Sequence, residues 1–191
     1  SEVIEIDIPE LEVSRISREC DVQLYEFNDQ VDQYLKDHPE APFETFKEIV
    51  DTGKLYPHIV KLMAGSAKLV NPKDHPDYLQ KLAHIDRNRE TVLAIMDEYD
   101  LDALTYPHQQ ILVEEIDSFS QAGRNGIIAS ILAFPSICVP AGYSLPDESA
   151  PLGVPIGLEF VARPNREDLL FELAYAFEQK NPNRKPPRST L

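Results

Sequence analysis

Cysteine is scarce in this sequence, which holds only Cys20 and Cys138 among 191 residues. The two lie far apart in the chain and show neither a disulfide framework nor the spacing of metal ligands. Sparse cysteine is typical of a reducing compartment, so the sequence predicts a cytoplasmic protein. Because Cys138 stands within an apolar run, we expect it to be a small buried residue.

Long apolar runs and basic charge are also lacking. No stretch of about 18 apolar residues occurs, so no membrane-spanning helix is predicted. Lys and Arg number 18 against 33 Asp and Glu, which gives a net charge of −15, and the first 40 residues carry twelve acids against three bases. Nucleic acids and anionic membranes bind through cationic patches, so neither is an expected partner.

Motifs of complete catalytic sites are missing. The sequence has no G-x-S-x-G nucleophile elbow, no glycine-rich phosphate loop and no H-E-x-x-H metal motif. Ser66, in "AGSAKL", lacks a glycine-rich turn and fits a helical stretch better than a nucleophile. His38, His75 and His108 each lie beside a proline and are expected in loops or caps. No catalytic residue, metal site or cofactor is therefore predicted.

Apolar residues at helical spacing predict most of the secondary structure. Helices are expected over 20–36, over a short stretch ending at Gly53, over 59–67, from Pro76 to about Tyr99, and over 126–134. A last helix is predicted with Asn165 as its N-cap and an end at Asn181, and its buried stripe is expected to hold Leu169, Leu170, Leu173, Ala174 and Phe177.

Four short strands are expected, over 3–8, 102–107, 136–143 and 154–162. In the last, Gly157 and Glu159 fall on the face opposite Leu158 and Phe160, and the glycine side leaves room for a backbone or a ligand to approach. Strands mixed with helices predict an α/β or α+β domain. Apolar strands need neighbours on both sides, so part of the sheet is expected to lie outside this sequence.

The run "RNGIIASILAFPSICVPAGYS", residues 124–144, combines an apolar helix pattern with Pro135, Pro140 and Gly142. Pro135 is expected to end the helix and begin a buried strand. This run, together with "PLGVPIGLEFVARPNREDLLFELAYAFEQ" and "RKPP", resembles the C-terminal part of the amidase signature family. The resemblance is specific from about Gly123 to Pro187 and weaker in "YEFNDQVDQYL", "TFKEIV" and "YDLDALTYP".

The resemblance implies a fold and a reaction. The fold would be the C-terminal portion of an α/β mixed sheet with flanking helices, and residues 1–191 would form one region, mainly helical over 1–122 and family-like over 123–187. The reaction would be hydrolysis of a carboxamide C–N bond through an acyl-enzyme, with a serine, a second serine on a cis peptide and a lysine. Those residues belong to the family's N-terminal half, which this sequence lacks, so the chain alone is expected to be inactive. Its first residue, Ser1, also indicates a chain that was processed or cut from a longer one.

The resemblance also implies a location for substrate. In the family, the helix before the Phe-Pro step borders the substrate channel, and the matching residues here are Gly123, Arg124, Asn125, Ile127 and Ile128. The two isoleucines fit plain core better than a channel wall. Arg124 stands in an apolar neighbourhood and, if buried, needs a partner, either a carboxylate of the missing half or one of a substrate.

Three functions remain open from the sequence. The chain is expected to belong to an amidase that acts on a small-molecule amide, with its catalytic half on another chain or removed. It could instead be a stand-alone module that binds a ligand or partner without catalysis. The transamidase branch of the same family is a third reading, but that branch works beside transfer RNA, and the acidic composition argues against it.

Overall fold

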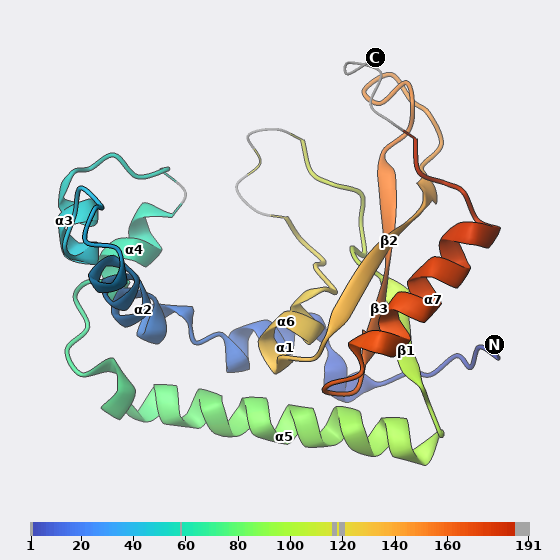
Figure 1. Cartoon of the computed structure of the whole chain (residues 1–191), viewed down its shortest axis with the longest axis horizontal. Coiled ribbons are helices and arrows are strands. Elements are labelled where there is room, and N and C mark those ends of the chain that lie inside the picture. The colour runs from blue at the N-terminus through green and yellow to red at the C-terminus, as the bar shows by residue number, and fades with distance from the viewer. Residues whose placement is uncertain (1, 58, 116–117, 119–120, 186–191) are drawn as a thin grey trace. The chain divides into compact units, whose positions relative to one another are not determined.

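The computed structural model describes residues 2–57, 59–115, 118 and 121–185 (Figure 1). The chain divides into two compact units, which are described separately: one comprises Ser1–Ser17 with Asp86–Leu191, and the other comprises Arg18–Ile85. The predicted grouping of residues 1–191 into one region stays a prediction, and the last two residues of its family-like part, 186 and 187, lie outside the described residues.

The unit formed by Arg18–Ile85 is helical. It contains α2 (Gln23–Asp37), α3 (Phe46–Asp51), α4 (Val60–Ser66) and a short 3-10 helix (Pro72–Asp74), and the predicted helices are confirmed. Thr45 caps α3 because its hydroxyl accepts a hydrogen bond from the Glu48 amide at 3.3 Å. The hydroxyl of Ser66, buried at the end of α4, accepts a hydrogen bond from the backbone N–H of Asn28 at 3.2 Å. This bond connects α4 to α2.

The N-terminal segment corrects one expectation. The alternation in residues 3–8 predicted a strand, but these residues form no regular structure, and a short 3-10 helix (Pro9–Leu11) follows. The apolar side of the alternation is not fully buried, since Ile4 is 48% exposed and Ile6 and Ile8 are only half-buried. A strand needs a neighbouring strand, and none of the described strands pairs with this segment. Two further helices precede the sheet in the sequence: α1 (Val13–Cys20) and the predicted long helix α5 (Pro76–Glu98).

The second unit holds a three-stranded antiparallel sheet. Its strands are β1 (Ala103–Pro107), β2 (Ser136–Tyr143) and β3 (Pro155–Ala162), in the order β1-β3-β2, as three of the four expected strands. The predicted helix before Pro135 is α6 (Ile127–Leu132), and it ends at Ala133, whose φ of 53° is left-handed. The register of β2 against β3 shifts between Pro140 and Gly142, where the proline cannot donate a ladder hydrogen bond.

The helix α7 (Glu167–Lys180) lies beside β2 and β3 in Figure 1. Phe177 of α7 packs edge-on against Phe160 of β3, with ring centroids 6.0 Å apart, so α7 covers the Phe160 face of the sheet. The predicted end at Asn181 is confirmed, but Asn165 is not the N-cap. Asn165 instead has a φ of 62°, which asparagine tolerates, and Arg166 takes the N-cap position without a side-chain capping hydrogen bond.

The core of the sheet unit lies where α5, α6 and β3 supply fully buried side chains. Met96, Leu132 and Ala162 are each 0% exposed. The Arg89 guanidinium of α5 donates a hydrogen bond from Nε to the Leu132 carbonyl at 2.6 Å, at the end of α6. This bond satisfies a carbonyl that the helix itself leaves unpaired, and so it anchors α6 to α5.

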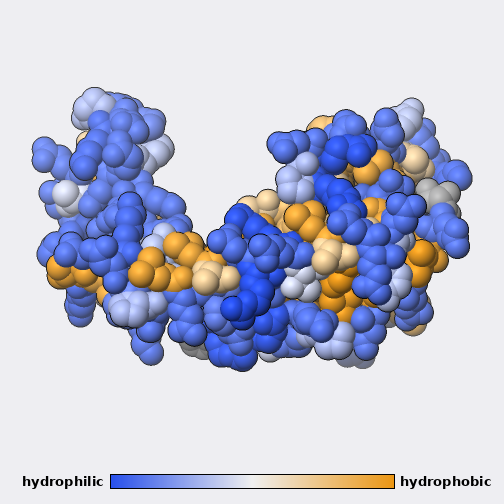
Figure 2. All heavy atoms as spheres, turned by 90° about the horizontal axis from the view of Figure 1, so that it is seen from below, coloured by the Kyte–Doolittle hydropathy of each residue, from blue (hydrophilic) through white to orange (hydrophobic). Residues whose placement is uncertain are grey.

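Hydrophilic residues cover most of the face drawn in Figure 2 (blue), in keeping with the net charge of −15. Exposed apolar side chains interrupt the surface elsewhere in the chain, including Phe171 and Tyr175 of α7, which are 66% and 67% exposed. Among the described residues, no helix combines the length and the apolar character that crossing a membrane requires.

Replacing Leu132 by alanine tests whether α6 is part of this core. Leu132 is 0% exposed, so Leu132→Ala should lower the free energy of unfolding by about 2–5 kcal/mol in urea titrations, because a cavity remains. The matched change Leu145→Ala removes a side chain that is 88% exposed and should change the free energy of unfolding by less than about 0.5 kcal/mol. Equal effects of the two changes would contradict this packing.

Candidate functional site

Polar side chains line up across the sheet on the face opposite α7. Tyr106 of β1 and Cys138 of β2 are both paired with Glu159 of the central strand. Directly opposite residues in antiparallel strands point to the same face. The three side chains therefore form one row, and Phe160, the next residue of β3, points to the other face, where Phe177 meets it.

Glu159 is the most unusual member of this row, because its side chain is only 4% exposed. A buried carboxylate is costly unless it is paired. His108, which follows β1, meets that need: its ring Nδ1 lies 2.9 Å from Glu159 Oε2. The His108 side chain remains 41% exposed, so the pair reaches from the core to the surface.

Two glycines leave space on this face, Gly126 for the His108 ring and Gly157 for the Cys138 sulfur. A Cβ at Gly126, the N-cap of α6, would lie 2.2 Å from Cε1 of the His108 ring, closer than any real contact. A Cβ at Gly157 would lie 2.6 Å from the Cys138 sulfur and 3.6 Å from His108 Cβ. The glycine side of β3, which the sequence marked as open to close approach, is therefore filled by Cys138 and His108.

Hydrogen bonds hold the predicted channel stretch against the segment after β1. The backbone N–H of Gln110 donates a hydrogen bond to the Gly123 carbonyl at 2.7 Å. Asn125 accepts from Gln110 Nε2 at 2.9 Å and donates from Nδ2 to the Pro107 carbonyl at 2.8 Å. Gln109 and Arg124 form an isolated β-bridge. Gly123, Arg124 and Asn125 thus lie beside His108 although 15 or more residues separate them in sequence.

The predicted channel residues occupy different surroundings. Arg124 is exposed rather than buried, and none of the described carboxylates forms an ion pair with it, so the expected need for a buried partner does not arise. Ile127 is half-buried, and Ile128, at 7% exposure, belongs to the core. Whether any of these residues contacts a substrate stays a prediction.

Two buried polar atoms on these segments have no hydrogen-bond partner among the described residues: the Tyr106 hydroxyl and Gln109 Oε1. Such orphan atoms are uncommon in folded proteins. Burial, and secondarily the Glu159 carboxylate, raises the pKa of the Tyr106 phenol, so the hydroxyl keeps its proton near neutral pH. The row therefore contains a buried donor beside the buried carboxylate.

Cys138 differs from its expected state, because it is exposed rather than buried. Apolar neighbours in sequence do not fix its burial, since alternate residues of a strand point to opposite faces. Although the residue is exposed, the partial burial of its thiol, and then the Glu159 carboxylate, raises the pKa of Cys138. A thiol that keeps its proton is a poor nucleophile, so the row is not an activated cysteine site.

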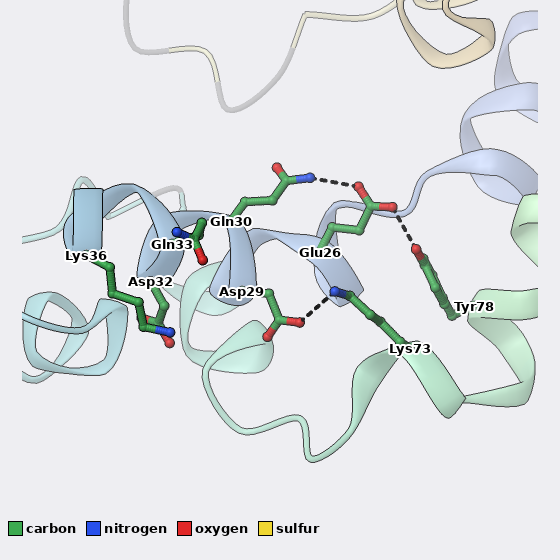
Figure 3. Close-up of a pocket in the computed structure, with 8 residues that line it drawn as sticks. All are labelled: Glu26, Asp29, Gln30, Asp32, Gln33, Lys36, Lys73 and Tyr78. Atoms are coloured by element: carbon green, nitrogen blue, oxygen red, sulfur yellow. Dashed lines mark hydrogen bonds and ion pairs between the residues drawn. The ribbon is translucent and has the colours of Figure 1, made fainter. Parts of the chain in front are cut away.

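The helical unit has its own cavity, of about 710 Å³ (Figure 3). Its polar groups pair with one another: Tyr78 donates to Glu26 at 2.9 Å, and Lys73 lies 3.4 Å from Asp29. Because these groups already pair with one another, we interpret the cavity as a solvated polar surface. In the described part of the chain, no three His, Cys, Asp or Glu side chains are arranged to hold a metal ion.

Sequence comparison decides the family. The family model described as Amidase matches residues 1–171. The chain belongs to the amidase family. A probable amidase of Arabidopsis thaliana is 28% identical over 174 residues, which are 86% of this chain and 30% of that protein. A glutamyl-tRNA(Gln) amidotransferase subunit of Gloeothece citriformis is 42% identical over 55 residues, which are 28% of this chain and 10% of that protein.

Solved structures show the same fold. The native peptide amidase of Stenotrophomonas maltophilia superposes with a TM-score of 0.70 at 24% identity, over 92% of this chain and 35% of that enzyme. The predicted α/β fold of the amidase family, with a small sheet and flanking helices, is therefore confirmed. The chain spans about a third of the length of the Arabidopsis and Stenotrophomonas relatives, at 30% and 35%.

Sequence reasoning missed the residues that the structure brings together. His108 was expected to be an ordinary loop or cap residue, and Tyr106, Cys138 and Glu159 were not linked. One signal was present: a single acid, Glu159, in the otherwise apolar strand "VPIGLEFVA". A lone charge in a central strand needs a partner, but the sequence does not say which residue supplies it.

Alkylation of the 191-residue chain by iodoacetamide should show the raised pKa of Cys138. Because the thiolate reacts, the rate should reach half its maximum above pH of about 8.5, the ordinary value for a free cysteine. Glu159→Gln should move that midpoint downward, because it removes one of the two causes. Cys20, which is 1% exposed, should stay unmodified in the folded chain and serves as the control. A midpoint at or below the ordinary value would contradict the surroundings described for Cys138.

Gly126→Ala should displace the His108 ring, because the new Cβ would lie 2.2 Å from Cε1. Overpacking of this kind costs about 1–3 kcal/mol of the free energy of unfolding, measured by urea titration. Ser130→Ala, at an exposed position of the same helix, is the control and should change little. A stable Gly126→Ala chain with unchanged His108 NMR signals would contradict the close approach.

Proposed function

We propose that this chain is the C-terminal portion of an amidohydrolase that cleaves carboxamide C–N bonds by a Ser-cisSer-Lys acyl-enzyme mechanism. The catalytic residues would lie in an N-terminal half that is not among these 191 residues. The observation that carries the proposal is the family match over residues 1–171 in a chain about a third as long as its relatives. The substrate would be a small-molecule amide, and the location is proposed to be cytoplasmic.

The sheet supports a partner for this chain. Only β3 is paired on both sides; among the described strands, β1 and β2 each leave one edge without a neighbour. An open edge presents backbone donors and acceptors that readily pair with another strand. The proposed occupant is the N-terminal half, either as a separate chain or as the rest of a longer one.

The proposed channel wall is the stretch of Gly123, Arg124, Asn125, Ile127 and Ile128. Its first three residues lie beside His108, whose side chain is 41% exposed. Arg124 is exposed, which leaves its guanidinium available to a carboxylate of a substrate or of the other half. Ile128 would support the wall from the core.

Activity measurements test the proposal directly. The chain alone should neither hydrolyse p-nitroacetanilide above background nor react with a serine-directed fluorophosphonate, since the nucleophile lies outside it. Mixed with the part of the Arabidopsis amidase that remains after its matched segment is removed, the chain should restore hydrolysis. That remainder alone is the control. Fluorophosphonate labelling of the chain alone would overturn the proposal that the nucleophile lies in a missing half. A complex that forms between the two parts but does not hydrolyse the amide would favour a stand-alone binding module.

Arg124→Ala separates the two roles of the arginine in that restored enzyme. If Arg124 holds the substrate carboxylate, KM for a substrate that carries one should rise about tenfold or more while the assembly of the two parts is unchanged. If it anchors the other half, the Kd between the parts should rise instead. Arg87→Ala, at an exposed position of α5, is the matched control. No change in either constant would remove Arg124 from the site.

A transamidase component is the second candidate, and the match to the Gloeothece amidotransferase favours it. The net charge of −15 opposes binding to transfer RNA, so hydrolysis is preferred. Glutamine-dependent formation of an amide on a second substrate by the restored enzyme, in place of simple hydrolysis, would reverse that preference.

A further inference from the structure

The buried Glu159 carboxylate and the half-exposed His108 ring form a pair that the proposed catalytic groups do not explain. We propose that Glu159 positions His108 so that its Nε2 accepts a hydrogen bond from the N–H group of a carboxamide substrate. This inference rests on the proposed function, because it takes the face beside Gly123–Asn125 as part of the amide channel. His108 would then help to determine which amides are bound.

The contact with Glu159 fixes the state of the ring. An ionised carboxylate only accepts hydrogen bonds, so the 2.9 Å contact places the proton on His108 Nδ1. In the neutral imidazole, Nε2 then carries a lone pair. Glu159, which only accepts hydrogen bonds, is 4% exposed and lies inside the protein. The His108 side chain is 41% exposed, so part of it is open to a ligand.

The backbone beside the ring fixes its orientation. Gly126 lies so close that a Cβ there would overlap Cε1 and approach Nε2 at 3.0 Å, so the ring is packed closely against the start of α6. The Gly126 amide also donates to the His108 carbonyl at 3.3 Å, and the His108 amide donates to the Gly157 carbonyl at 3.0 Å. Both the main chain and the side chain of His108 are therefore held in place.

Among the neighbouring polar groups, His108 offers the more exposed acceptor, because the other unpaired acceptor, Gln109 Oε1, is a buried atom. Asn125 is engaged at both ends of its amide, by Gln110 and by the Pro107 carbonyl. The Tyr106 phenol keeps its proton, and its hydroxyl is a buried atom. The Cys138 thiol is a weak acceptor. A substrate N–H group therefore finds its best partner in His108 Nε2, whereas a carboxylate, which only accepts, does not match a neutral imidazole.

Nitrogen-15 NMR of the histidine rings in the full 191-residue chain, recorded at pH 8, tests the positioning. His108 should show a protonated Nδ1 and an unprotonated Nε2. Glu159→Gln should abolish that preference, because the glutamine amide both donates and accepts. Glu19→Gln is the matched control, since Glu19 Oε2 lies 3.3 Å from His84 Nδ1 and the change should affect His84 but not His108.

Titration with two small amides tests the binding. N-methylacetamide, which has one N–H group, should shift the His108 Nε2 resonance, whereas N,N-dimethylacetamide, which has none, should not. The shift should be lost in Glu159→Gln. Sodium acetate at the same concentration controls for non-specific effects and should give no shift at Nε2.

The outcomes decide the inference separately from the proposed function. A protonated Nε2 in the unmodified chain, equal shifts with both amides, or no shift with N-methylacetamide would each overturn it. If Glu159→Gln does not fold, the tautomer and the two titrations of the unmodified chain still give the answer. Restored hydrolysis without the NMR response would leave the amidase proposal standing and remove His108 from it, whereas the NMR response without restored hydrolysis would mark an amide-binding module.

Discussion

The contact between the buried Glu159 carboxylate and the His108 ring is the constraint on which the sheet unit depends. A carboxylate in the central strand of a small sheet is tolerated only when a partner meets it, and removing one member of such a pair is far more costly than never having it. The segment after β1 must therefore stay beside β3, and the chain at Gly126 must lack a side chain. The approach of α6 to the sheet follows from the same requirement.

Much of the fold could be predicted because it depends on local patterns. The helices α2, α5 and α7 have apolar residues at helical spacing over three or more turns, and the strands are bounded by prolines and glycines. Pro135 marks the change from helix to strand for a covalent reason, since proline restricts the residue before it. The likeness of residues 123–187 to amidases carried the family assignment, which the match over residues 1–171 confirmed.

The candidate site could not be predicted in the same way, because its members are distant in sequence. His108 and Glu159 are 51 residues apart, and only the strand register brings them together. The errors have a similar origin. Residues 3–8 have the alternation of a strand but no partner, Cys138 was assigned by its neighbours rather than by its face, and Arg124 is exposed although the residues after it are apolar. Local patterns indicate which secondary structure a segment favours, whereas contacts with distant segments decide which structure it forms.

The strand order has a consequence for biosynthesis. The central strand β3 is the last of the three to be made, so β1 and β2 leave the ribosome with no described strand between them. Until residue 162 has emerged, the histidine after β1 has no carboxylate, and the apolar faces of both outer strands are uncovered. Domains that depend on such distant pairing fold slowly and are prone to aggregation while incomplete. The nascent chain is therefore most prone to aggregation until β3, with Glu159, has emerged.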